Sequence, residues 1–124
     1  MTTYHAVVWM DQEQAHVLHF DREHVEASRV RSRSHHKHQG RGSDRAAYFA
    51  AISAALGGSH EVLLAGPGCT REDFRKWVAA HLPAAAQFVV GSVAADHPTD
   101  GQLVALARQF FLRHDRMASD PSMA

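Results

Sequence analysis

The first thirty residues show the spacing of apolar and polar positions that is typical of β-strands. Residues 4–10 contain a continuous apolar run of strand length, which predicts a strand buried on both faces. Polar, turn-like residues at 11–14 and 21–22 separate it from two further strands, predicted at residues 15–20 and 23–30. The last of these alternates between apolar and polar residues, as expected of a half-exposed edge strand. Three strands joined by short turns predict an antiparallel meander.

After residue 43 the apolar positions recur at helical spacing instead. Helices are expected at residues 44–56, 70–82 and 99–115, and two short apolar runs between them predict strands at 61–65 and 88–93. Ser, Asp or Thr stands at each expected helix start, and Gly or Pro ends the first two helices. The positions expected to face the core are Tyr48, Phe49, Ile52, Ala55, Leu56, Phe74, Trp77, Val78, Leu82, Leu103, Leu106, Ala107, Phe110 and Phe111.

The resulting order, β-β-β-α-β-α-β-α, predicts an α/β fold in three layers. An antiparallel meander followed by two right-handed crossovers adds parallel strands, with the fourth strand beside the first, which is the ribonuclease H-like motif. The rival, a doubly wound flavodoxin-like sheet, needs a helix between the first strands, and none is visible. At 124 residues the chain fits one domain, expected at residues 1–117, with a fraying tail at 118–124.

Charge is distributed very unevenly along the chain. The stretch from Ser28 to Ser43 holds five of the 13 Lys and Arg residues and none of the 13 Asp and Glu residues, which leaves eight basic against thirteen acidic residues elsewhere. A segment of this composition neither buries an apolar face nor neutralises itself. It predicts a mobile basic loop at residues 29–43, whose commonest polyanionic partner is nucleic acid.

The basic loop and the residue that follows it make the predicted RNA-binding site. Guanidinium and ammonium groups donate hydrogen bonds to phosphate oxygens, and glycines allow close approach of the backbone. The residues predicted to contact RNA are Arg29, Arg31, Arg33, His35, His36, Lys37, His38, Gln39, Gly40, Arg41, Gly42 and Arg45. The alternative is a solvated loop without a partner. The histidines also suit Zn, Ni or Cu, but a short His tract lacks the fixed geometry of a site, so neither a metal nor a cofactor is expected.

Other chemistry is weakly supported. Gly66-Pro67-Gly68 before a helix could bind phosphate, but it lacks the P-loop Gly-Lys-Ser/Thr, and a tight turn is the simpler interpretation. Two-metal nuclease chemistry needs converging carboxylates, and only Asp11 follows the first strand. There is no nucleophile elbow, and the aromatic residues Trp9, Trp77, Phe110 and Phe111 fall in apolar stripes typical of core.

The composition also suggests a compartment. No apolar run approaches the roughly 20 residues of a membrane span, and the start shows no basic region followed by an apolar one, so we expect neither a membrane partner nor a secretory signal. Cys69 is the single cysteine, which excludes an internal disulfide and suits the cytoplasm.

Four short motifs occur in order along residues 4–112: Ala6-Val-Val-Trp-Met-Asp11 with Ala15, Lys37-His38 with Gly40-Arg-Gly42, Leu64-Ala-Gly-Pro-Gly68 with Asp73-Phe74, and His97-Pro-Thr-Asp100. With these the chain resembles the central domain of archaeal and eukaryotic class-1 peptide-chain release factors and of Pelota. It is more similar still to the short bacterial proteins related to them, called translational machinery proteins. The resemblance implies a ribonuclease H-like fold and a partner in the ribosome, through ribosomal or transfer RNA.

One departure from that family bears on mechanism. Release factors carry Gly-Gly-Gln after the basic motif, whereas here Gly42 is followed by Ser43 and Gln39 precedes the glycines. The resemblance therefore favours a translation-associated accessory protein that binds RNA without hydrolysis, as in Pelota. The alternatives are a peptidyl-tRNA hydrolase in which Gln39 or a bound water replaces the missing glutamine, and an adaptor that binds a metal or protein through the basic loop.

Overall fold

The structure, a computed structural model, describes residues 5–32 and 41–119, with side chains for residues 5–32 and 45–115. Strands and helices follow one another in the predicted order, with one short helix added before the last strand. The elements are β1 (His5–Met10), β2 (Gln14–Phe20), β3 (Val25–Arg31), α1 (Arg41–Ala55), β4 (Glu61–Gly66), α2 (Thr70–His81), α3 (Pro83–Ala86), β5 (Val89–Ala94) and α4 (Asp100–Ser119).

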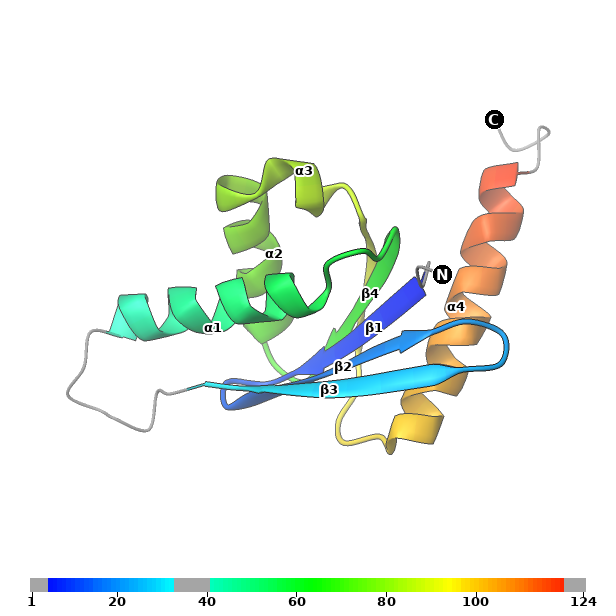
Figure 1. Cartoon of the computed structure of the whole chain (residues 1–124), viewed down its shortest axis with the longest axis horizontal. Coiled ribbons are helices and arrows are strands. Elements are labelled where there is room, and N and C mark those ends of the chain that lie inside the picture. Colours follow the sequence, from blue (N-terminus) through cyan, green and yellow to red (C-terminus); the bar gives the residue numbers. More distant parts are fainter. Residues whose placement is uncertain (1–4, 33–40, 120–124) are drawn as a thin grey trace.

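The strands form one mixed sheet in the order β3-β2-β1-β4-β5 (Figure 1). The pairs β1–β2 and β2–β3 are antiparallel, as a meander requires, while β4 pairs parallel with both β1 and β5. Parallel neighbours need a crossover connection, which α1 and α2 provide. The predicted α/β fold and the placement of the fourth strand beside the first are confirmed.

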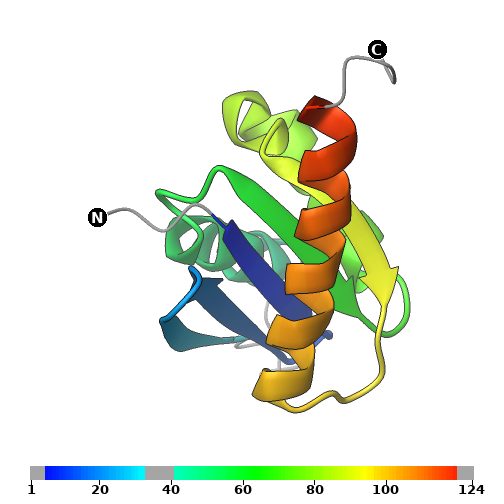
Figure 2. The same ribbon diagram turned by 90° about the vertical axis from the view of Figure 1, so that its right-hand side faces the viewer.

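Each strand of the sheet centre contributes to two cores because its side chains alternate between the two faces. On β1, Val8 points to the core shared with α1 and α2, whereas Val7 and Trp9 point to the core shared with α4. Figure 2 looks onto the face covered by α4, which crosses in front of the sheet. On β2 the alternation places Val17 in the core shared with α1 and α2, and Leu18 in the core shared with α4.

Aspartates fix the two turns of the meander. Asp11 Oδ1 accepts hydrogen bonds from the backbone N–H groups of Glu13 (2.8 Å) and Gln14 (2.9 Å). Asp21 Oδ1 does the same for Glu23 (2.8 Å) and His24 (2.7 Å), and these bonds lower the pKa of the Asp21 carboxyl. The second turn holds residues 23 and 24, so β3 begins at Val25, two residues later than predicted.

The basic loop is shorter than predicted. β3 pairs with β2 as far as Arg31, which lies opposite Gln14, and α1 begins at Arg41 instead of after a cap at Ser43 or Asp44. Regular hydrogen bonding thus extends into the basic stretch from both sides. The predicted mobile loop at 29–43 therefore does not include residues 29–31 or 41–43, which belong to β3 and α1.

The buried positions agree with most of the predicted core. Phe49, Ile52, Phe74 and Phe111 are buried. Leu82 was wrongly assigned, because α2 ends at His81 and the Leu82 side chain, at the cap between α2 and α3, is 40% exposed. Four other positions predicted to face the core are only half-buried and lie at the rims of the two cores: Ala55, Trp77, Leu106 and Phe110.

Helix capping follows the sequence in one case and departs from it in another. At the start of α4 the Thr99 backbone N–H donates to Gln102 Oε1 (2.9 Å), and the Gln102 N–H donates to Thr99 Oγ1 (3.1 Å), as a capping box requires. Thr70 and Asp73 have the same spacing at the start of α2 but form no such box, because Cys69 occupies the cap position and no side chain caps the helix. Asp73 is thereby available for another partner.

Candidate functional site

The predicted RNA-binding residues fall into three groups in the structure. Arg29 and Arg31 belong to β3, while Arg41, Gly42 and Arg45 belong to α1. Figure 1 shows the end of β3 and the start of α1 on the same side of the molecule. The remaining residues lie outside the described part of the chain, so their contacts stay predictions: Arg33, His35, His36, Lys37, His38, Gln39 and Gly40.

Arg29 and Arg31 are exposed and share one face of the edge strand. In the β2–β3 register Arg29 lies opposite His16 and Arg31 opposite Gln14. The His16 ring packs against the edge of Trp9 at 5.7 Å, so this face is the one that α4 covers at the sheet centre. Among the side chains described, those of residues 5–32 and 45–115, none forms an ion pair with either guanidinium, so we expect both charges to be available to an external anion.

A shallow hollow lies beside Arg29. It has a volume of about 190 Å³ and includes His16, Ala27, Arg29 and Asp100 in its lining. The Nδ1 atom of His16 lies 3.5 Å from Asp100 Oδ1, so the first residue of α4 contacts the basic edge. The hollow is too small for a nucleotide.

Arg45 differs from Arg29 and Arg31 because a carboxylate of the same chain neutralises its charge. Its guanidinium forms an ion pair with Asp73 of α2 and lies 5.3 Å from the centroid of the Phe49 ring. Asp73 can form this pair because its carboxylate is not used as a cap at the start of α2. Contact between Arg45 and RNA remains a prediction, and it requires competition with this pair.

The glycine turn after β4 is structural, as expected. Gly66 has φ +140° and Gly68 φ +65°, both in the region that favours glycine. A Cβ on Gly66 would lie 2.1 Å from the carbonyl oxygen of Met10. Arg71 donates to the Gly66 carbonyl oxygen (2.9 Å) and to Ser92 Oγ (2.6 Å), which ties α2 to the ends of β4 and β5.

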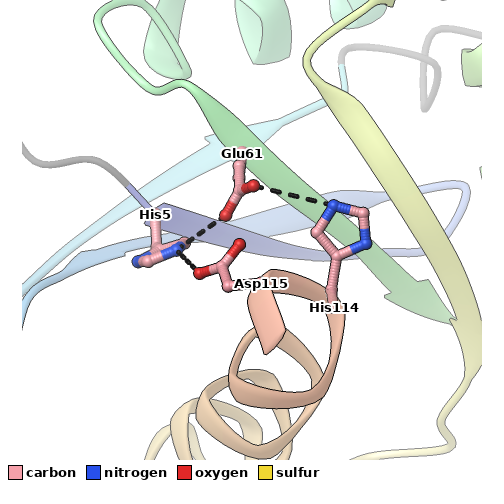
Figure 3. Close-up of polar contacts among 4 residues, drawn as sticks. All are labelled: His5, Glu61, His114 and Asp115. Atoms are coloured by element: carbon pink, nitrogen blue, oxygen red, sulfur yellow. Dashed lines mark hydrogen bonds and ion pairs between the residues drawn. The ribbon is translucent and has the colours of Figure 1, made fainter. Parts of the chain in front are cut away.

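A second polar cluster escaped sequence reasoning. His5 begins β1, Glu61 begins β4, and His114 and Asp115 lie towards the end of α4, and Figure 3 shows the four side chains converging. The Nε2 atom of His5 lies 2.8 Å from Glu61 Oε1 and 3.3 Å from Asp115 Oδ2. His114 Nε2 lies 3.6 Å from the other Glu61 oxygen. The parallel pairing of β1 with β4 places His5 opposite Glu61. The sequence could have indicated this contact only through the expected neighbourhood of the first and fourth strands.

The cluster is partly desolvated. Side-chain exposure is 13% for Glu61 and 24% for His5, against 45% for Asp115. Burial raises the pKa of the Glu61 carboxyl, and its contact with Asp115 acts in the same direction. His5 opposes both effects. A hollow of about 450 Å³ adjoins the cluster and is lined by His5, Phe20, Asp21, Arg22, Arg108, Phe111, Leu112 and Asp115.

None of the helices within residues 5–32 and 41–119 has the length and apolar character needed to cross a membrane.

Sequence comparison identified neither a matching family model nor a matching curated protein. Solved structures do match. The Pelota protein of Thermoplasma acidophilum aligns with 85% of this chain at a TM-score of 0.65 and 24% identity. The archaeal translation termination factor aRF1 aligns with 93% at 0.57 and 13% identity. Dom34 of S. cerevisiae, described as a translation termination-like factor involved in RNA quality control and interacting with Hbs1, aligns with 98% at 0.55 and 11% identity.

This chain spans only part of each matched protein: 32% of the Thermoplasma Pelota chain, 42% of aRF1 and 34% of Dom34. Because the sequence identities are low, these matches show a similarity of fold alone. They confirm the resemblance to release factors and Pelota that the four sequence motifs indicated.

Proposed function

We propose that this chain is a translation-associated accessory protein of the cytoplasm that binds ribosomal or transfer RNA through its basic stretch, without hydrolysing peptidyl-tRNA. The observation that carries the proposal is the pair Arg29 and Arg31, exposed and without an ion-pair partner in the described chain. Both arginines lie on the edge strand β3, in a chain whose fold is similar to parts of Pelota, aRF1 and Dom34. The names of those proteins support a role in translation.

We also propose that the fold is of the ribonuclease H-like type. The strand order β3-β2-β1-β4-β5, antiparallel on one side of β1 and parallel on the other, supports this assignment. Nuclease activity is not part of the proposal. The carboxylate of Asp11, which follows β1, is committed to hydrogen bonds within its turn, and catalysis by two metal ions needs several converging carboxylates.

The proposed binding is electrostatic and positions the protein on an RNA backbone. The Lys and Arg residues of the basic stretch displace counterions when they contact phosphates. Contact by five cations with a single strand gives a slope of roughly −3.5 for log affinity against log salt concentration, at about −0.7 per phosphate. The absence of Gly-Gly-Gln after the basic motif supports binding without peptide release.

Binding is tested by fluorescence anisotropy with a single-stranded ribosomal RNA fragment over a salt series, together with co-sedimentation with ribosomes. The Arg29→Gln/Arg31→Gln double variant removes two of the five contacts, so the slope is expected to fall in magnitude by roughly 1.4. The matched control is Arg75→Gln/Arg113→Gln, which removes the same charge from exposed positions on α2 and α4. An unchanged slope in the Arg29/Arg31 variant, or an equal effect of the control, contradicts the proposal.

The non-hydrolytic mode is tested separately on ribosomes that carry peptidyl-tRNA. We expect bound protein and no released peptide. Release that disappears in Gln39→Ala identifies the chain as a hydrolase and overturns this part of the proposal while leaving RNA binding intact.

A further inference from the structure

We infer that His5, Glu61 and Asp115, with His114 beside them, form a binding site for a divalent transition-metal ion of the zinc class. The four residues come from three elements that meet at one end of the sheet (Figure 3). The site is separate from the basic stretch and does not depend on the proposed function.

The spacing of the ligand atoms suits a single ion. One nitrogen of His5 and one carboxylate oxygen each of Glu61 and Asp115 all lie within 4.8 Å of one another. Tetrahedral zinc, with bonds of about 2.1 Å, separates its ligand atoms by about 3.4 Å. The 3.3 Å between His5 Nε2 and Asp115 Oδ2 already matches this separation, and the 2.8 Å to Glu61 Oε1 needs a small opening.

His114 lies beside these three ligands, against the other oxygen of Glu61. Its Nε2 atom lies 3.6 Å from Glu61 Oε2 and the imidazole is partly buried. The Glu61 carboxylate therefore has an imidazole on each of its oxygens. Three converging protein ligands leave one position of a tetrahedral zinc ion open to water or another small ligand.

The chemistry of the donors selects the metal. Imidazole nitrogen suits zinc and its first-row neighbours, whereas magnesium and calcium prefer sites made of oxygen alone. The two carboxylates also balance the charge of a divalent ion. We therefore expect Zn²⁺ to bind and Mg²⁺ to fail.

The electrostatics of the cluster also favour a cation. Glu61 and Asp115 place two carboxylates together, and the neighbouring arginine is directed elsewhere. Arg108 donates to the backbone oxygen of Asp21 (2.8 Å) and lies 5.6 Å from the centroid of the Phe20 ring. A bound divalent ion would offset the repulsion and join α4 to the starts of β1 and β4.

The test uses the full chain with His35, His36 and His38 replaced by Gln, because this tract is the competing zinc ligand set in the sequence. Isothermal titration with Zn²⁺ at pH 7.5 is expected to show one ion per chain. The melting temperature should rise by roughly 10 °C at a hundredfold excess of zinc over Kd. Mg²⁺ at the same concentration should change neither measurement.

Two ligand variants and one control decide the assignment. Asp115→Asn, at a half-exposed position, and Glu61→Gln are each expected to weaken zinc binding at least tenfold while the metal-free proteins stay folded by circular dichroism. Asp96→Asn is the matched control, since Asp96 lies 3.2 Å from His97 but is 92% exposed and has no third ligand. Its affinity should remain within twofold of the parent protein.

Two results overturn the inference. One is the absence of a 1:1 zinc site tighter than about 10 μM in the Gln-substituted parent protein. The other is equal affinity in the parent, Asp115→Asn and Glu61→Gln proteins, which shows that any bound zinc sits elsewhere.

Discussion

The fold opposes the ionisation of Glu61. Burial raises the pKa of its carboxyl, and Asp115 adds to the effect, while His5 acts against it. The folded chain therefore holds the Glu61 proton more tightly than the unfolded chain does. Its contribution to stability is full below the unfolded pKa and falls as pH rises through the raised pKa of the folded state.

Replacement of Glu61 by Gln should remove this dependence in protein freed of metal by a chelator. Relative to the Glu61→Gln variant, the wild-type protein should lose free energy of unfolding as pH rises from 4 to 8. Urea denaturation at unit pH steps measures the difference.

The control for this prediction is Glu13→Gln, because Glu13 is exposed in the β1–β2 turn. Its difference from the wild-type protein should vary little over the same interval. A Glu61→Gln difference that is flat, or that grows in favour of the wild type at high pH, would show that the desolvation of Glu61 is unimportant.

At the scale of elements, α4 is the single helix that the described chain places on its face of the sheet. Its buried residues Leu103, Ala107 and Phe111 recur at helical spacing and pack on β1, β2 and β4. Phe111 lies 4.4 Å from the His5 ring and 6.0 Å from the Phe20 ring, measured between centroids. This contact joins the helix to the start of β1.

Phe111→Ala is expected to reduce the free energy of unfolding by roughly 3–5 kcal/mol, because it leaves a cavity where α4 meets the sheet. Leu112→Ala, one residue further, should change it by less than about 0.5 kcal/mol, since Leu112 is 63% exposed. Chemical denaturation of both variants measures the contrast. Similar losses in the two would mean that α4 is not docked through Phe111.

The elements themselves were largely predictable from sequence, because local periodicity determines which face each of them buries. The strands β1 and β2 and the buried stripe of α4 were found in this way. The errors lie where a local signal had a tertiary competitor. Asp73 carries a capping pattern yet pairs with Arg45, and Leu82 continues an apolar stripe yet stands at the end of α2.

The two sites differ in how far sequence reveals them. The basic stretch is continuous, so its charge is visible without a structure. The His5 cluster joins residues 56 and 54 positions apart, and the register of β1 with β4 and the docking of α4 create it. No local pattern marks such a site.

At the scale of the whole molecule, the folded body and the basic stretch are separable in composition. Residues 33–40, Arg-Ser-His-His-Lys-His-Gln-Gly, contain no apolar side chain to contribute to a core. The sheet and helices on either side form both cores from residues elsewhere. Binding and folding should therefore respond independently to changes in this segment.

Replacement of residues 33–40 by a Gly/Ser linker of equal length should leave the free energy of unfolding within about 1 kcal/mol, because the length of the closed loop is unchanged. It should also weaken RNA binding, through the loss of Arg33 and Lys37. Thermal unfolding and anisotropy on the same preparation measure the two effects. A large loss of stability would show that the segment is part of the folded body.

The position of β3 at the margin of the sheet has a practical consequence. Its outer backbone groups adjoin no further strand in the part of the chain that the structure describes, and an open strand of this kind invites self-association. Arg29 and Arg31 supply the mutual repulsion that discourages it. Neutral substitutions at these positions therefore remove a safeguard against oligomers, so sedimentation velocity should establish monodispersity before any change in affinity is interpreted.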